Sequence, residues 1–282
     1  MSNPLETYFR QPAIYITLPS KGEYYPPDTL TFNENKEIAV YPMTAKDEIV
    51  MKTPDALLTG QSTVDVIQSC IPAIKDAWKI PSIDIDTILI AIRIATYGEE
   101  MPVSIPITEI KESLSASVNL TNALERVNSH VPNTELILPS GIKVKIKPID
   151  YAMMSRQAMR VYDEQRMVRT VQDSELDDET KTKKYMEVFT KVAMYSVDEM
   201  ISSIDTIHTP DGKQVTEQGY ITEFVQNMDV STSKLIKQKI DEIRKTGAIP
   251  PMDYDVPEDM VEKGAPKTIS VPMTFDTSVF FG

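Results

Sequence analysis

A phrase of sequence occurs twice in this chain, and it limits the folds that the chain can adopt. The first copy begins at Ile16 and reads ITLPSKGEYYPPDTLTFNENKEIAVYPMTAKDEIVMKTPDALL; the second begins at Leu136 and reads LILPSGIKVKIKPIDYAMMSRQAM. Each copy runs from Leu-Pro-Ser through a glycine turn and an alternating strand to a proline, and then into a helical pattern. We therefore expect a unit of turn, strand, proline and helix to be used twice. The aligned identities are few, so duplication and coincidence both stay open.

Neither copy contains a nucleophile beside a base, a metal-ligand cluster or a phosphate-binding loop. This absence favours docking and assembly over catalysis. The 282 residues are enough for one large domain or two small ones, with 41% hydrophobic and 25% charged residues as in a globular protein. The formal net charge of −13 disfavours nucleic acid as the main partner, because nucleic-acid binders carry basic patches that contact phosphates.

The side chains that most often carry chemistry are scarce. The single cysteine, Cys70, lies among aliphatic residues, which predicts a buried thiol and no disulfide. The two histidines, His130 and His208, lie far from any cysteine or carboxylate pair with ligand spacing. Asp84 and Asp86 are spaced like cation ligands, but we expect them to belong to the start of a helix. The sequence therefore predicts no cofactor, no metal site and no enzyme, and a carboxylate-based hydrolase is the least favoured alternative.

Helical periodicity and turn signals together predict the fold class. We expect an α+β fold that is mainly helical, with short β-hairpins, an extended N-terminal arm and an extended C-terminal tail. The N-terminus lacks the apolar core of a signal peptide, and the most apolar stretch, residues 83–95, is too short and too charged to cross a bilayer. The expected regions are an extended or β N-terminal arm over 1–42, a helical region over 43–132, a β-hairpin over 133–150, a helical region over 151–247 with a hairpin near 200–216, and an extended proline-rich tail over 248–282.

Two groups of side chains are candidates for partner binding. A basic row alternates with aliphatic residues on a predicted strand, so that one face of the strand is buried and the other is charged. This row suits an acidic partner, although a solubilising edge strand explains it equally well. The row consists of Lys143, Lys145 and Lys147. The second group is the aromatic C-terminus, Phe275, Phe280 and Phe281, which we expect to dock either onto this chain or onto a partner.

Three stretches carry a resemblance to a known family. They are VYPMTAKDEIVMKTPDALLTGQSTVDVIQSC, IDTILIAIRIATYGEEM and the ending MTFDTSVFFG, and ISSIDTIHTPDGKQV followed by ITEFVQNM extends the match. Together they resemble the baseplate hub assembly proteins of T4-like contractile-tailed bacteriophages, over about residues 16–249 and 268–282. Some relatives place a cysteine-pair zinc ribbon before this ending. The present chain has no cysteine after Cys70, so we expect no metal-dependent role.

The resemblance implies a non-enzymatic protein of tail and baseplate hub assembly, made in the host bacterial cytoplasm. It leaves open whether the protein stays in the baseplate of the virion tail or acts only as an assembly factor. The implied partners are other phage tail and baseplate proteins, and the tape-measure protein is one candidate. Neither nucleic acid nor a membrane is an expected partner. The resemblance does not give the oligomeric state. The alternative is a regulatory protein-binding module outside the virion, which uses the lysine row or the methionine-rich helix predicted over 152–171.

Overall fold

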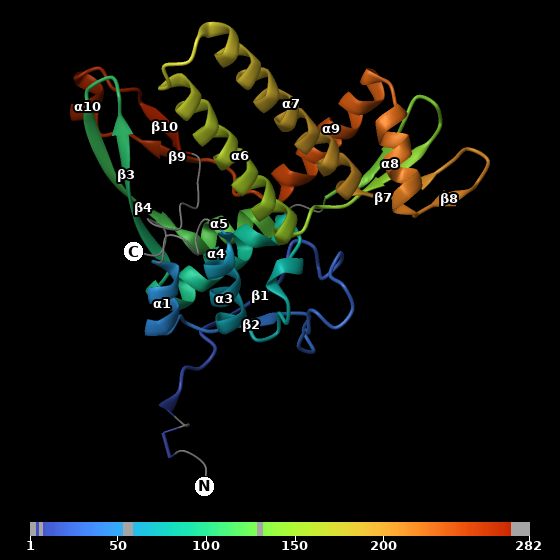
Figure 1. Ribbon diagram of the computed structural model, residues 1–282. Helices are drawn as coiled ribbons and strands as arrows, with labels where there is room; N and C mark the ends of the chain where they lie inside the picture. The colour runs from blue at the N-terminus through green and yellow to red at the C-terminus, as the bar shows by residue number, and fades with distance from the viewer. Residues whose placement is uncertain (1–3, 6–7, 53–58, 129–131, 272–282) are drawn as a thin grey trace.

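The computed structural model describes the chain except for residues 1–3, 6–7, 53–58, 129–131 and 272–282. Its fold is α+β and mainly helical, as predicted, and its strands form small antiparallel sheets. Figure 1 shows an antiparallel helix pair, α6 and α7, above the N-terminal part of the chain, with a β lobe on one side and a four-stranded sheet on the other. Buried side chains gather into three cores, which the following paragraphs take in turn.

The first core lies in the N-terminal half. Its centre is α4, Ser82–Tyr97, which is buried over most of its length because its aliphatic residues point in nearly every direction. The hairpin β1–β2 covers this core through Ile16 and Val40, so the region predicted as an N-terminal arm contains a hairpin packed on helices. The other elements here are β1 (Ile14–Ile16), β2 (Ile38–Val40), α1 (Ala45–Met51), α3 (Gln61–Cys70), the short 3-10 helix η2 (Ala77–Lys79) and α5 (Leu120–Asn128).

The second core lies under a four-stranded sheet of order β5-β6-β7-β8. Ile146 and Ile207 on the inner face of this sheet pack with Ile221 and Ile240, which come from the helices α8 and α9. Both predicted hairpins, over 133–150 and near 200–216, are therefore present within one sheet. Its elements are β5 (Glu135–Ile137), β6 (Lys143–Ile146), α6 (Tyr151–Gln172), α7 (Asp178–Ser203), β7 (Ile204–His208), β8 (Gln214–Val215), α8 (Gln218–Asn227) and α9 (Val230–Gly247).

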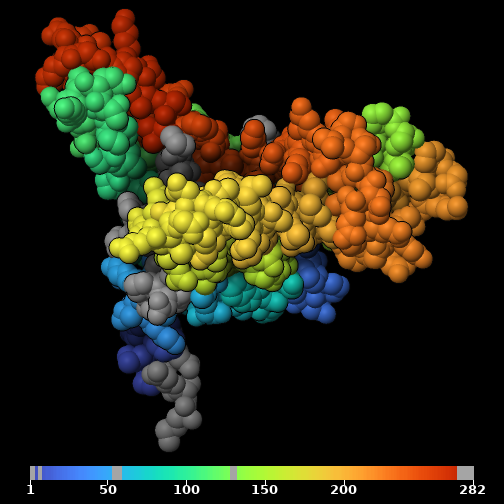
Figure 2. Space-filling model, turned by 45° about the horizontal axis from the view of Figure 1, so that its top comes forward, coloured from blue at the N-terminus to red at the C-terminus, as the bar shows by residue number. Residues whose placement is uncertain are grey.

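The third core belongs to a β lobe formed by two distant stretches of the chain. Ile105 and Leu114, from a hairpin inside the region predicted to be helical, pack against Val256 and Ala265 from the region predicted to be a tail. Figure 2 shows this lobe standing out from the body of the molecule. The sequence signal is weak here because the first strand carries two prolines and the second is rich in serine. The lobe consists of β3 (Glu100–Ile107), β4 (Glu112–Asn119), β9 (Met252–Asp255), α10 (Glu258–Glu262) and β10 (Thr268–Val271).

The recurring phrase forms the same turn in both places. The backbone N–H of Lys21 donates to the carbonyl oxygen of Leu18, and that of Gly141 donates to the carbonyl oxygen of Leu138, both at 2.9 Å. In each turn proline takes the second position, where its fixed φ is favourable. The fourth residue has a positive φ, 54° for Lys21 and 81° for Gly141. Glycine adopts this conformation at little cost, whereas lysine is strained there.

The ends of the two units also match. The residue before each proline, Tyr41 or Lys147, donates its N–H to the last residue of a helix that follows later in the unit. The acceptors are the carbonyl oxygens of Cys70 at the end of α3, at 2.8 Å, and of Ser203 at the end of α7, at 2.7 Å. In its described residues each unit therefore runs from a hairpin through a proline into helices, and the end of one of these helices is hydrogen-bonded to the residue before the proline.

Candidate docking surfaces

The lysine row lies on β6 and on the residue that follows it, Lys147, with the alternation that the sequence predicts. Val144 and Ile146 are buried in the second core, while the lysine side chains lie on the opposite face. The strand is interior, however, because β6 pairs with both β5 and β7. The edge-strand explanation of the row is therefore wrong. On an interior strand the lysines are not needed to block pairing with another chain, so another reason for their presence is required.

Two acidic side chains lie beside the row: Asp205 on β7, and Glu135 on β5, which lies directly opposite Lys145 in the register. The carboxylate of Asp205 on β7 is 3.8 Å from the Nζ of Lys145 and 3.8 Å from the Nζ of Lys147. All three side chains are partly exposed, so each of these ion pairs contributes little to stability. Lys143 lies opposite His208 in the register and has no ion pair within the described residues. The row thus carries three positive charges against the two negative charges of Asp205 and Glu135.

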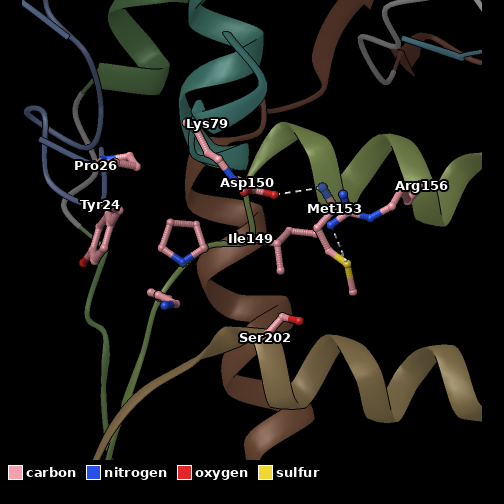
Figure 3. A pocket seen from close by; sticks show the side chains of 10 residues that line it. Tyr24, Pro26, Lys79, Ile149, Asp150, Met153, Arg156 and Ser202 are labelled. Atoms are coloured by element: carbon pink, nitrogen blue, oxygen red, sulfur yellow. Dashed lines mark hydrogen bonds and ion pairs between the residues drawn. The ribbon is translucent and has the colours of Figure 1, made fainter. Parts of the chain in front are cut away.

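A pocket of about 280 Å³ continues the basic surface beyond Lys147. It lies where the two copies of the recurring phrase meet, since Tyr24 and Pro26 come from the first copy and Lys147 from the second. Figure 3 shows Tyr24 and Pro26 on one side of the pocket and Arg156 of α6 on the other. The pocket is therefore built from parts of the chain that are far apart in sequence.

The charged groups of the pocket are unequal in sign. Three cations line it, Lys79, Lys147 and Arg156, against the single carboxylate of Asp150. Asp150 already accepts a hydrogen bond from the backbone N–H of Met153 at 2.8 Å as the N-cap of α6, and it pairs with Lys79 at 3.1 Å. The pocket has neither histidine nor cysteine in its lining. Its chemistry suits the binding of a carboxylate rather than acid–base catalysis.

The remaining sequence candidates divide into two groups. Phe275, Phe280 and Phe281, like His130, lie outside the described residues, so their role stays a prediction. Cys70 is buried as predicted, and burial, with Asp47 nearby, raises the pKa of its thiol to about 12. His208 is exposed at the end of β7.

The two aspartates of α4 lie at the start of the helix, as expected. The carboxylate of Asp84 accepts hydrogen bonds from the backbone N–H of Ser20 at 2.8 Å and from the hydroxyl of Tyr25 at 3.0 Å. Burial raises the pKa of Asp84 to about 6, and it does the same for Asp86. Asp84 thus fixes the first copy of the recurring phrase to the central helix. Within the described part of the chain no group of three or more His, Cys, Asp or Glu side chains is placed to hold a metal ion.

One surface is absent from the sequence candidates. Large apolar side chains are exposed along α6, α7 and the loop between them. They are Val161, Tyr162, Met167, Leu176, Met186, Phe189, Val192 and Met194. We expected a methionine-rich helix over 152–171 but did not single out the second helix. The available signal was a second apolar stripe on α7, spaced at three and four residues. Of the helices described, none is long and apolar enough to span a membrane.

A basic strand face, a pocket lined by three cations and exposed apolar side chains on two helices are features of proteins that bind other proteins. The profile of a protein family described as "T4 bacteriophage base plate protein" matches residues 13–257. The chain therefore belongs to this family of phage baseplate proteins. The match covers both copies of the recurring phrase and confirms the resemblance to T4-like baseplate proteins. No curated protein and no solved structure matches the chain significantly.

Proposed function

We propose that this baseplate protein acts in the assembly of the baseplate hub of a contractile tail, and that it does so by binding an acidic segment of another tail protein. The observation that carries the proposal is the continuous basic surface formed by the lysine row and the pocket beside it. This surface collects five cations, Lys79, Lys143, Lys145, Lys147 and Arg156, against the three carboxylates of Glu135, Asp150 and Asp205, in a protein whose net charge is −13.

The surface contributes mainly to orientation and to the rate of association. Exposed charges attract a partner of opposite sign over about 8 to 10 Å at physiological salt, which raises the association rate and fixes the docking register. The rest of the acidic protein repels the same partner. An acidic segment is therefore guided to one face of the molecule. The pocket then receives one carboxylate of that segment between Lys147 and Arg156.

The proposal places the protein in the host bacterial cytoplasm during assembly, with a non-enzymatic role. The partner is another tail or baseplate protein, and the tape-measure protein is one of the candidates to be tested. Whether the protein then stays in the baseplate decides if it is a virion component or an assembly factor. A regulatory module outside the virion would use the same surface for a partner that is not a tail protein.

The test compares two variants of equal charge. K143E, K145E and K147E together reverse the row, and K36E, K234E and K237E reverse three exposed lysines elsewhere. The row variant should lose at least tenfold in co-purification with tail intermediates from infected cells, while the control variant should behave as wild type. Equal recovery of both variants would refute the role of the row. Recovery of wild type only with proteins outside the tail would favour the regulatory alternative.

A further inference from the structure

A groove runs between the central helix α4 and the helix α6 above it (Figure 1). Its volume is about 620 Å³, within the size range of pockets that bind ligands. The wall from α6 is largely apolar, and two of its large side chains, Val161 and Tyr162, are 43% and 45% exposed. The other wall is formed by the start of α4 and by Gly247 and Ala248, where α9 ends. The groove therefore presents apolar surface that is only half covered.

The charged groups of the groove are paired except for one carboxylate. Glu199 and Arg244 form an ion pair with each other, and Arg244 also pairs with Asp241 at 3.3 Å. Asp86 on α4 has no ion pair within the described residues, and burial raises its pKa to about 6. A carboxylate in this position accepts hydrogen bonds from hydroxyl groups and repels a second carboxylate.

Beyond the groove, the same face of α4 carries an arginine without an acceptor. Arg93 lies seven residues after Asp86, so the two side chains share one helix face and are about 10 Å apart along the helix axis. The Nε and Nη1 atoms of Arg93 are buried and have no hydrogen-bond partner within the described residues. Its guanidinium lies over the ring of Tyr97, 4.4 Å from the centroid, and burial lowers the pKa of Arg93. Buried donors without an acceptor are costly, so this position requires one.

The last described residue lies close to both walls of the groove. Val271 is opposite Met252 in the β9–β10 register, and Met252 packs on the first core four residues after Ala248. Val271 also packs in the third core with Val103, six residues after the end of α4. The 11 residues that follow, 272–282, extend over at most about 36 Å. This length exceeds that of α4, which is about 24 Å for its 16 residues.

The composition of residues 272–282 complements the groove. The segment reads PMTFDTSVFFG, with three phenylalanines, three hydroxyl side chains, no basic residue and one acidic residue, Asp276. The phenylalanines suit the apolar wall from α6, and the single carboxylate suits the single guanidinium of Arg93. The hydroxyl groups suit Asp86, and the spacing along α4 keeps Asp276 away from that carboxylate. A tethered segment also has an effective concentration of the order of millimolar, which favours it over a free partner.

We propose that residues 272–282 of the same chain occupy the groove between α4 and α6, with their phenylalanines on the α6 wall and the carboxylate of Asp276 on the guanidinium of Arg93. The segment covers Val161 and Tyr162 and fastens α6 to the central helix. The aromatic C-terminal residues are thereby assigned to this chain and not to a partner. The inference is independent of the proposed function, because it involves neither the lysine row nor another protein.

The first experiment locates the segment in the purified full chain. A photo-crosslinking amino acid replaces Val161 in the groove, and a matched control carries it at Val192 of α7, which is 42% exposed and does not line the groove. Trypsin releases residues 268–282 as one peptide after Lys267, so mass spectrometry identifies the contact directly. We expect this peptide to be crosslinked to the probe at position 161 and not to the probe at position 192.

An equal mixture of ¹⁵N-labelled and unlabelled chains identifies the source of the crosslinked peptide. A segment docked in its own chain gives only pairs in which both peptides carry the same label. A segment exchanged between two copies also gives pairs of mixed label. Mixed pairs at the frequency of random pairing, crosslinks to a different part of the chain, or no specific crosslink at position 161 would overturn the proposal.

The second experiment tests the contact between Asp276 and Arg93. We expect D276N and R93M each to lower the melting temperature by about 2–4 °C, and the double variant to lose no more than R93M alone, because both changes remove the same interaction. D253N removes an exposed carboxylate from β9, and its effect should be the same with and without R93M. An unchanged melting temperature in D276N, or losses from D276N and R93M that add in full, would refute the docked position of the segment.

Discussion

Gly247, the last residue of α9, lies directly against the backbone of Ile83 in the first turn of α4. A Cβ atom at position 247 would be 2.4 Å from the Cα of Ile83 and 2.6 Å from its carbonyl oxygen. The contact joins the two halves of the molecule, because α4 is the centre of the first core while Ile83 belongs to the second. Only glycine lets two helix backbones approach this closely.

This contact makes Gly247 intolerant of a methyl group. We expect G247A to lower the free energy of unfolding by about 1–3 kcal/mol, because the overpacked atoms are backbone and cannot rotate away. Gly219 provides the matched control, since it lies inside α8 with open space around its Cβ position. G219A should raise stability by about 0.5–1 kcal/mol through helix propensity. Urea unfolding measures the free energy of unfolding of both variants. Equal effects of the two substitutions would contradict the close approach of α9 and α4.

Asp84 predicts a particular dependence of stability on pH. Burial raises its pKa from 3.8 to about 6, against the opposing effect of the hydrogen bonds from Ser20 and Tyr25. Between about pH 4 and pH 6 the unfolded chain has lost this proton while the folded chain keeps it, so ionisation favours the unfolded state. The contribution of Asp84 to stability therefore falls as the pH rises through this window, by about 3 kcal/mol for a shift of about two units.

The measurement compares the free energy of unfolding at pH 4.5 and pH 7 for wild type and D84N. The asparagine variant should lose less stability over this interval than wild type, because position 84 no longer titrates. D65N removes an exposed carboxylate from α3 and serves as the control for charge. If the free energy of unfolding changed with pH equally in wild type and D84N, Asp84 would not be buried as described.

Arg10 connects the N-terminal segment to two helices. Its guanidinium donates to the carbonyl oxygens of Pro42 at 2.6 Å and Ser69 at 2.7 Å, and it lies 3.3 Å from the carboxylate of Asp47. The Arg10 side chain is 27% exposed, so solvent screens its ion pair with Asp47 only partly. We expect R10M to lower the free energy of unfolding by about 2–3 kcal/mol, because it leaves the nearly buried Asp47 carboxylate without its cation.

Thermal unfolding provides the test for Arg10. R166M removes an arginine that is 72% exposed and should change the melting temperature little. R10K should recover only part of the loss, since lysine cannot reach several acceptors with a planar fork. Wild-type stability in R10M would mean that the N-terminal segment does not contact the first core.

Cys70 should be chemically silent in the folded protein. Its side chain is fully buried, and burial raises the pKa of the thiol to about 12, so the reactive thiolate is scarce at pH 8. A coloured thiol reagent should react with about one thiol per chain in urea and with almost none under native conditions. Rapid reaction without urea would contradict the packing around α3.

Much of the local structure could be predicted from the sequence, because it depends on neighbouring residues. Both Leu-Pro-Ser turns, both hairpins of the four-stranded sheet and the long helix after Asp150 follow from turn chemistry and periodicity. The β3–β4 hairpin escaped prediction because Pro102 and Pro106 weaken its first strand and the partner strand is rich in serine. The lobe it forms with β9 and β10 depends on packing between segments that no local pattern connects.

The candidate surfaces follow the same division. The alternation of Lys143, Lys145 and Lys147 is visible in the sequence, whereas the position of Asp205 between two of them depends on the pairing of β6 with β7. The exposure of Phe189 could not be predicted, because an apolar stripe on a helix predicts burial until the covering element is known. Among the residues that the structure describes, Phe189 stays 70% exposed and Met186 64% exposed.

The most direct test of the proposed function is quantitative mass spectrometry of tail intermediates and finished virions separated from infected cells. The proposal predicts that this chain is present in the intermediates that contain the baseplate hub, at a fixed ratio to the hub proteins. Its amount in finished virions then distinguishes a structural component from an assembly factor. Absence from every tail intermediate, with abundant protein in the same lysate, would contradict the proposal.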